Sequence, residues 1–194
     1  LQILPREIIL KLNQTNNKDV SFTVNSATII FINIDKFSIY ASSLPPTDVM
    51  KNLSKIFSAI DFALAKYSLL TKIKLMGDVY FAAAGIFSPG VDPDKHANQV
   101  IQFALEVLNA MEALNIQMDA NLQVRIGVNT DGPLTAGVLG VEKPLFEVFG
   151  EPIIDAERIE KDCIPGCINI SEKTYKLIVE NSTYHIEPHG EVQL

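Results

Sequence analysis

ATIIFINIDKF, residues 27–37, is the stretch of sequence that decides the fold. Residues 27–34 are rich in β-branched side chains and are apolar at successive positions, so both faces of this strand are expected to be buried. Such a strand lies inside a sheet, with other layers packed on each side of it. Asp35 and Lys36 then lead the chain into a turn. The sequence therefore predicts a central strand over residues 27–34.

The segments that follow this strand alternate between helix and strand patterns. Gly77-Asp78 joins two predicted strands at 71–76 and 79–86, which is a hairpin signal. Apolar residues at helical spacing predict long helices over 49–64 and around 100–111. The remaining predicted elements are strands at 122–128, 134–139, 146–149, 167–170 and 184–194, and helices at 152–161 and 171–179. This order predicts an α+β fold with helices packed on a mixed sheet.

The two ends of the chain frame a single domain. Residues 1–13 carry apolar residues at helical spacing, with Pro5 where a helix could begin, and 14–19 is a polar linker. We therefore assign an upstream helical linker element to 1–20 and the domain to 21–194. Because the chain starts at a leucine and stops within a predicted strand, we expect a fragment of a larger protein, truncated at its last strand.

Composition limits the classes of function. Apolar residues make up 47% of the 194 residues, which is enough for a core and excludes a disordered chain. No apolar run approaches the length of a membrane span, so we expect no direct membrane insertion. A net charge of −7 argues against a nucleic-acid partner. Two cysteines and three histidines supply neither a disulfide framework nor a convincing zinc site.

Four motif segments follow one another along the chain. They are FINIDKF (31–37), KLMGDVY (74–80), RIGVNTDGPLTAGVLG (125–140) and FEVFGEP (146–152), the last continuing to AERIE (156–160). In this order, with His96-Ala97 opening the second long helix, they resemble the catalytic domain of class III adenylate and guanylate cyclases. The resemblance covers residues from about 27 to 194. No phosphate-binding loop of the Walker type occurs, so any nucleotide would be held without one.

The resemblance implies a fold, a reaction and an assembly. The class III fold is a ferredoxin-like mixed or antiparallel sheet with helices packed on it. These domains form head-to-tail dimers, as homodimers or with another cyclase domain, and each active site draws residues from both subunits. They convert ATP or GTP to the 3′,5′-cyclic monophosphate and pyrophosphate with two divalent cations, Mg²⁺ or Mn²⁺. Two cations neutralise charge as the phosphoryl group is transferred.

The metal positions that the resemblance implies are only half acidic in this chain. Asp78 matches the aspartate of the hairpin, and the backbone of Ile34 would also face a cation, but the first-strand position is Asn33. At about 4 Å and an effective dielectric of about 20, losing one carboxylate–cation interaction removes on the order of 4 kcal/mol. Asp35 lies on the same strand face as Asn33 and could compensate.

The base-reading positions that the resemblance implies are Lys74 and Glu147. Adenine presents an acceptor at N1 and a donor at its exocyclic amine, while Lys74 supplies only donors and an ionised Glu147 only acceptors. In the family, Lys and Asp at these positions read adenine, and Glu and Cys read guanine. The pair therefore predicts ATP as the substrate, with an acid one methylene longer than usual. The alternative is an exposed lysine and an exposed edge glutamate without a ligand role.

Of the two positions that the resemblance assigns to the transition state, only one carries the family residue. Arg158 matches the family arginine that would bind phosphate oxygens. Ile154 stands where the family has an asparagine that orients the ribose, and its side chain makes no hydrogen bond. Loss of one such preorganised donor typically costs about 10²–10³ in rate.

Three hypotheses about activity follow. The first is an adenylate cyclase domain, and the second is a catalytically impaired pseudo-cyclase that acts as a regulatory or heterodimerising half. In a homodimer both sites would carry Asn33 and Ile154, whereas an intact partner could supply the metal pair in a heterodimer. The third is a ferredoxin-like interaction domain without a nucleotide. We expect a cytoplasmic location, as the cytosolic domain of a larger membrane-anchored protein.

Overall fold

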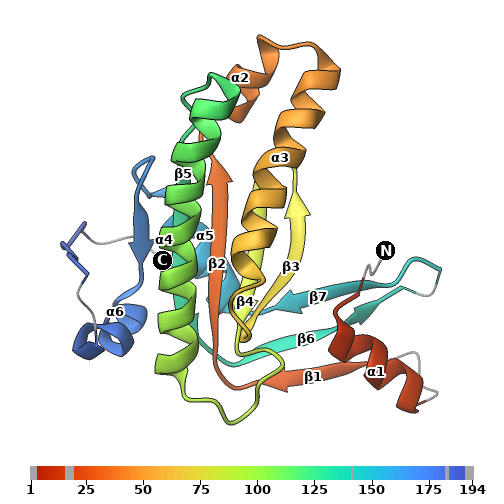
Figure 1. Cartoon of the computed structure of the whole chain (residues 1–194). Helices are drawn as coiled ribbons and strands as arrows, with labels where there is room; N and C mark the ends of the chain where they lie inside the picture. The colour runs from red at the N-terminus through yellow and green to blue at the C-terminus, as the bar shows by residue number, and fades with distance from the viewer. Residues whose placement is uncertain (1–3, 16–19, 141, 182–183, 191–194) are drawn as a thin grey trace.

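The computed structural model describes residues 4–15, 20–140, 142–181 and 184–190. It contains a main sheet covered by helices and a smaller sheet that projects to one side (Figure 1). The strands of the main sheet are β2 (Ala27–Ile34), β3 (Leu70–Met76), β4 (Val79–Ala84), β5 (Val124–Asp131) and β8 (Ile168–Ile170). The strands of the smaller sheet are β1 (Ser21–Val24), β6 (Leu134–Leu139) and β7 (Leu145–Phe149).

Strand β2 lies in the middle of the main sheet, whose spatial order is β3–β4–β2–β5–β8. It pairs antiparallel with β4 and with β5, and β5 pairs parallel with β8. With the helices α3 (Pro46–Leu64) and α4 (Pro93–Met118), the strands β2 to β5 follow the βαββαβ order of a ferredoxin-like fold. The predictions of a central strand over 27–34 and of an α+β sheet carrying helices are confirmed.

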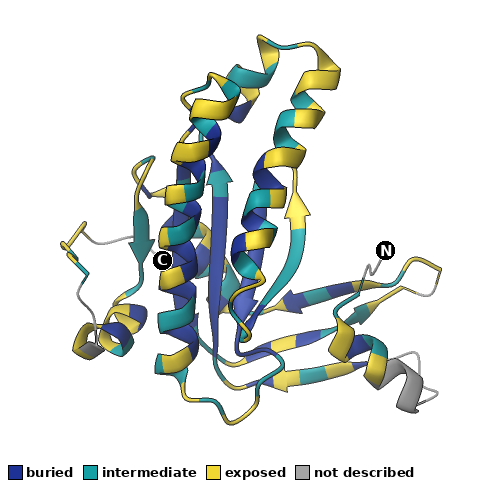
Figure 2. Ribbon diagram, in the orientation of Figure 1, coloured by how far each residue is buried: buried dark blue, intermediate teal, exposed yellow. Residues whose placement is uncertain are grey.

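Side chains of β2 alternate between two cores. The strand is buried along nearly its whole length (Figure 2). Ile30, Ile32 and Ile34 face α3 and α4 and are almost completely buried. Ile29 and Phe31 face the opposite side, where they pack with side chains of the smaller sheet. Because each core buries one face of the strand, β2 stabilises both layers of the molecule.

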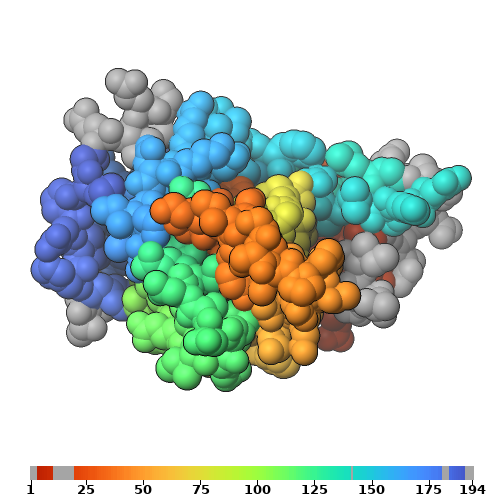
Figure 3. Space-filling view, turned by 90° about the horizontal axis from the view of Figure 1, so that it is seen from above, coloured from red at the N-terminus to blue at the C-terminus, as the bar shows by residue number. Residues whose placement is uncertain are grey.

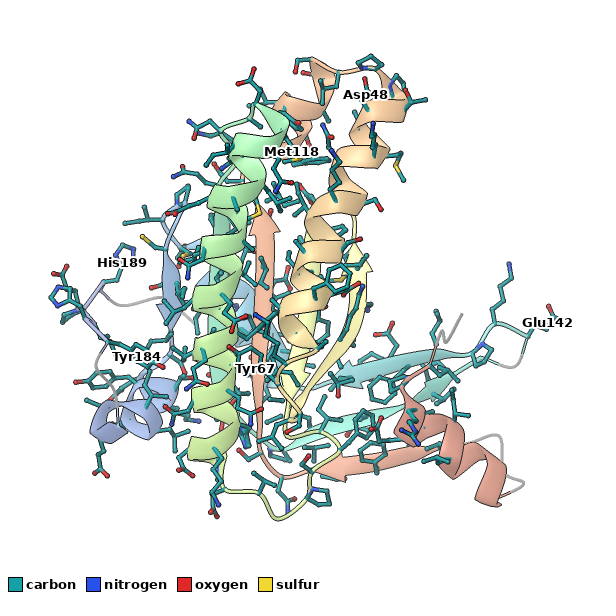
Figure 4. The ribbon with its side chains drawn as sticks, viewed as in Figure 1. Asp48, Tyr67, Met118, Glu142, Tyr184 and His189 are labelled. Atoms are coloured by element: carbon teal, nitrogen blue, oxygen red, sulfur yellow. The ribbon has the colours of Figure 1, made fainter. Side chains whose placement is uncertain are left out.

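The second core also includes the first helix of the chain. Helix α1 (Arg6–Thr15) contributes Ile8, which is fully buried among Val20, Leu134 and their neighbours. The upstream element therefore packs on the smaller sheet. The hairpin of β6 and β7 extends away from the main sheet, with Glu142 at its tip (Figure 4).

Helix α5 (Glu151–Lys161) lies against β5 on the face opposite α3 and α4. A Cβ atom added to Gly127 of β5 would lie 2.3 Å from the backbone nitrogen of Glu160 and 2.7 Å from the carbonyl oxygen of Ala156. Only glycine permits two backbones to approach so closely. The position of α5 on the sheet is therefore set by direct backbone contact.

A chain of buried polar side chains crosses the main sheet where β2 begins and β5 ends. His96, at the start of α4, lies with its Nδ1 2.7 Å from the hydroxyl of Thr28, which is 2.8 Å from that of Thr130. The Thr174 hydroxyl, from helix α6 (Glu172–Ile178), donates to Thr130 at 3.0 Å. Burial lowers the pKa of His96, and the nearby Asp94 partly opposes this. The neutral imidazole therefore joins α4 to β2, β5 and α6.

Three segments differ from the sequence-based predictions. Strand β1 and the short helix α2 (Phe37–Ser42) are present although the sequence analysis predicts neither. The strand predicted at 184–194 is wrong for residues 184–190, which have no regular secondary structure, and residues 191–194 lie outside the described part. Within the described residues, no helix combines the length and apolarity needed to cross a membrane.

Substitution Gly127→Ala tests the contact between α5 and β5. We expect it to lower the free energy of unfolding by about 3 kcal/mol, because the added methyl group overlaps the α5 backbone. Gly77→Ala is the control: Gly77 has a φ of 64° but open space around its Cβ, so only about 1 kcal/mol of backbone strain is expected. Urea denaturation measures both, and an equal loss in the two variants would contradict the packing of α5.

The pH dependence of stability tests the buried imidazole. Because folding lowers the pKa of His96 below 6.5, the unfolded chain takes up the proton first. This contribution to stability is complete above about pH 6.5 and is lost as the pH falls below it, by at most about 1.4 kcal/mol per pH unit. We expect His96→Asn to remove this slope between pH 7 and 5, while the exposed control His189→Asn keeps it. An unchanged slope in His96→Asn would refute the assignment.

Candidate active site

The end of β2, the turn between β3 and β4, and the start of β5 meet at one end of the main sheet. Asn33 lies in register with Val79 on one side and with Arg125 on the other. The backbone N–H of Ile34 donates to the carbonyl oxygen of Asp78 at 3.2 Å. Figure 3 looks down on this end and shows the β3–β4 hairpin (yellow) between α2 and α3 (orange) and the β6–β7 hairpin of the smaller sheet (turquoise). The structure thus brings the predicted metal positions Asn33 and Asp78 to neighbouring strand ends.

A buried charged cluster lies beside Asn33. Arg125 Nε is 3.1 Å from Glu160 Oε1 of α5, and Arg125 Nη1 is 3.9 Å from Asp35 Oδ1. Arg125 Nε and Glu160 Oε1 have no hydrogen-bond partner, so their contact is an ion pair without an aligned N–H. Burial raises the pKa of Glu160, while Arg125 acts in the opposite direction.

The residues at this end of the sheet do not supply a full set of ligands for two divalent cations. Among the described residues, no group of three or more His, Cys, Asp or Glu side chains is arranged to hold a metal ion. Asn33 offers only a neutral carbonyl oxygen. Asp35 is turned inward, only 14% exposed, but faces the guanidinium of Arg125. Among the described residues, Asp78 is therefore the one predicted metal position whose carboxylate forms no salt bridge with a lysine or arginine.

Lys74 and Glu147 contact each other across the two sheets. Lys74 Nζ donates to both carboxylate oxygens of Glu147, at 2.7 and 2.9 Å. A β-bulge between Lys72 and Lys74 makes this contact possible, because Lys72 pairs with Ala82 whereas Lys74 pairs with Phe81. Lys72 therefore points to the face of α3, where it binds Asp61, and Lys74 points to the opposite face. The predicted base-reading residues form one unit of a donor and an acceptor.

Arg158 and Ile154 lie one helical turn apart on the outer side of α5. Their exposures are similar: the Arg158 side chain is 40% exposed and Ile154 is 43% exposed. The Arg158 guanidinium is 3.5 Å from Asp155 and 3.9 Å from Glu151, both on its own helix. Arg158 is thus presented at the surface and held by weak contacts that a phosphate could replace.

Sequence reasoning assigned no role to Arg125 or Glu160. The signal for Arg125 is its register: it is the β5 residue that pairs directly with Asn33. For Glu160 the signal is its burial, since a glutamate that is only 2% exposed requires a charged or hydrogen-bonding partner. Neither signal can be read without knowing which strands are neighbours.

The chain is similar to cyclases of both base specificities. The family model for the adenylate and guanylate cyclase catalytic domain matches residues 20–194. The germination-specific adenylate cyclase of Dictyostelium discoideum is 35% identical over 94% of this chain and 21% of its own length. The receptor-type guanylate cyclase gcy-27 of Caenorhabditis elegans is 29% identical over 87% of this chain and 23% of its own length. The guanylate cyclase domain of RhGC from Catenaria anguillulae, solved with GTP, has a TM-score of 0.73 at 31% identity, covering 80% of this chain and 83% of that domain.

The family model spans nearly the whole chain. The chain spans about a fifth of the length of the two curated relatives. The family match excludes the alternative in which the motif order is accidental in an unrelated interaction domain. Together with the ferredoxin-like sheet, they lead to one conclusion: the chain belongs to the adenylate and guanylate cyclase catalytic domain family, as a class III nucleotide cyclase domain.

Proposed function

We propose that this domain works in the conversion of ATP to 3′,5′-cyclic AMP and pyrophosphate, as the adenine-reading half of a site shared between two cyclase domains. The observation that carries this proposal is the contact between Lys74 and Glu147. One supplies only donors and the other only acceptors, which complements the N1 acceptor and the amino donor of adenine. Guanine presents donors where adenine has N1, so it would face the lysine with the wrong group.

Arg158 would bind the phosphate oxygens. Its guanidinium carries a fixed charge and a donor geometry suited to phosphate, and its present partners are on the helix surface. Ile154, one turn earlier, provides no hydrogen bond for the ribose. The resemblance implies four polar groups in the adenine half of the site, at positions 74, 147, 154 and 158. This chain has three of them, because Ile154 is apolar.

The partner domain would supply the metal half of the shared site, which comprises the positions equivalent to Asn33 and Asp78. Class III cyclases use divalent cations, which neutralise the triphosphate when bound. Because Asn33 leaves this chain short of one carboxylate, we propose a heterodimer in which the other domain provides both aspartates. The second candidate, a pseudo-cyclase that regulates an active partner, is favoured by the same two residues, Asn33 and Ile154.

The cellular setting follows from the substrate and the relatives. We propose that the domain is cytosolic, where ATP is abundant, and that it belongs to a larger membrane-anchored protein. The partial coverage of relatives that include a receptor-type cyclase supports this setting.

Complementation between two variants tests the shared site. One carries Asn33→Asp with Lys74→Ala, and the other carries Ile154→Asn. Only a mixed dimer joins a complete metal half to a complete adenine half. We expect the mixture to form cyclic AMP from ATP at a rate at least tenfold above the sum of the separate proteins, faster with Mn²⁺ than with Mg²⁺.

The controls are the unmixed variants and the unmodified homodimer, which we expect to be very slow or inactive. Rapid Mg²⁺-dependent turnover by the unmodified homodimer would refute the view that Asn33 and Ile154 impair the site. A mixture no more active than its components would refute the assignment of the two halves.

Exchange of the base-reading pair tests the preference for ATP. In the Asn33→Asp, Ile154→Asn background, we expect Lys74→Glu with Glu147→Cys to shift the ratio of kcat/KM for ATP over GTP by at least tenfold toward GTP. Glu147→Asp is the matched control and keeps the preference for ATP, because it retains an acceptor opposite the amino group. A GTP preference before any exchange would overturn the proposal.

A further inference from the structure

Asp61, near the end of α3, accepts hydrogen bonds from two strands of the main sheet. The Lys72 Nζ of β3 donates to both of its carboxylate oxygens at 2.9 Å, and the Tyr80 hydroxyl of β4 donates to Oδ1 at 2.6 Å. The Lys72 Nζ also lies 5.0 Å from the centre of the Tyr80 ring, within the range of a cation–π contact. Asp61, Lys72 and Tyr80 therefore form one cluster, which we call the Asp61 cluster.

Tyr80 gives this cluster a fixed position. Its side chain is fully buried in the core under α3 and α4. Burial and the hydrogen bond to Asp61 both raise the pKa of the phenol, so it remains a neutral donor. Because a buried hydroxyl requires a hydrogen-bond partner, the carboxylate of Asp61 is held over β4. Lys72 therefore finds an acceptor already in place on the α3 face of the sheet.

The Asp61 cluster lies directly beside the bulge in β3. The residue before the bulge, Lys72, pairs with Ala82. The residue after it, Lys74, pairs with Phe81, and Ile73 is the extra residue between them. Ile73 packs against the second core, on the side to which Lys74 also points. An inserted residue reverses the alternation of side chains, so without it Lys74 would follow Lys72 to the α3 face.

Two side-chain contacts hold the bulge at this place, one on each face of the sheet. Before the bulge, Lys72 is bound to Asp61. After the bulge, Lys74 is bound to Glu147. The second contact is the one that the proposed function gives up, because the donor and the acceptor turn to the base when it binds. With a base bound, the bulge depends on the Asp61 cluster and on the packing of Ile73.

We propose that Asp61 is a positioning residue for base recognition, which directs Lys74 to the adenine by holding Lys72 on the opposite face of β3. The proposal rests on the proposed function in one respect, that Lys74 reads the base. Asp61 touches no substrate in this role, because it acts through Lys72 and the bulge. Its loss therefore weakens the binding of ATP more than it slows the chemical step.

Substitution Asp61→Ala tests this role through the choice of base. In the background that carries Asn33→Asp and Ile154→Asn, we expect it to lower the ratio of kcat/KM for ATP over GTP at least fivefold, because Lys74 loses its fixed direction. Most of the loss is expected in the KM for ATP, with kcat changed less than twofold. Asp61→Glu keeps a carboxylate for both donors and should keep the ratio within twofold of the background.

The chain offers a matched control in a second cluster of the same composition. Glu106 of α4 accepts from Lys66 Nζ at 2.7 Å and from the Tyr67 hydroxyl at 2.6 Å, beyond the end of α3 (Tyr67 is labelled in Figure 4). Glu106→Ala removes the same two kinds of contact away from the bulge, so we expect the ratio for ATP over GTP to stay unchanged. An equal fall in Glu106→Ala and Asp61→Ala would reveal a general loss of stability and overturn the proposal.

Combined variants separate a positioning role from a structural one. Lys72→Met removes the cation but leaves Tyr80 its acceptor, and it carries the test if Asp61→Ala does not fold. We expect Lys72→Met to lower the ratio as Asp61→Ala does, with no further fall when the two are combined, because both break one contact. With Lys74→Ala present, Asp61→Ala should leave the ratio unchanged. A fall in the ratio without Lys74 would refute the route through this lysine.

Nuclear magnetic resonance follows the bulge without an assay of activity. In the unmodified protein we expect one set of backbone signals for residues 72–74, with the cross-strand contact between Lys74 and Phe81. Asp61→Ala and Lys72→Met should weaken this contact and add a second set of signals, while Glu106→Ala should do neither. An unchanged register in both cluster variants would overturn the proposal.

The two readouts keep this proposal apart from the proposed function. If the register changes as expected but neither the restored background nor the complementation mixture forms cyclic AMP, the placement of Lys74 by Asp61 stands and the adenylate cyclase assignment fails. If the background is active and Asp61→Ala leaves its ratio for ATP over GTP unchanged, the proposed function stands and the positioning role of Asp61 fails.

Discussion

Burial of β2 on both faces is the constraint on which the rest of the structure depends. Its isoleucines and Phe31 fill one core under α3 and α4 and another over the smaller sheet. A polar side chain inside this strand needs a buried partner, as Thr28 finds in His96 and Thr130. Only where the strand ends can polar groups reach both water and ligand. The same pattern that builds the two cores therefore confines the chemistry of Asn33 and Asp35 to one end of the sheet.

Elements with a clear apolar face could be predicted from the sequence, and so could the residues tied to them. The bounds of β2 agree with the prediction. Lys74 and Glu147, which the sequence analysis pairs as base-reading residues, are in contact in the structure. The reason for that contact could not be predicted. Simple alternation would place Lys74 on the same face as Lys72, and it is the bulge between them that turns Lys74 toward β7.

Short elements and the charged cluster depend on partners that lie far away in the sequence. Strand β1 is four residues long and exists because it pairs with β6, while α2 is a turn and a half following Lys36 in the left-handed region. Arg125 and Glu160 meet because β5 and α5 are in backbone contact at Gly127. Periodicity describes the face that a segment buries, but it does not identify the segment that covers it.

The two predicted halves of the active site differ in what keeps their residues in place. The Lys74–Glu147 ion pair is partly exposed, and pairs of that kind contribute only about 0–1 kcal/mol to stability. Stability alone is therefore a weak reason for its geometry, and the proposed role in base recognition rests on its donors and acceptors. At the metal half the opposite holds, because the buried carboxylate of Glu160 lies 3.1 Å from Arg125 and the loss of that partner would disturb α5. The Lys74–Glu147 pair can thus exchange its partners for a ligand at little cost in stability, as the proposed adenine-reading role requires, whereas the Arg125–Glu160 pair contributes to the fold.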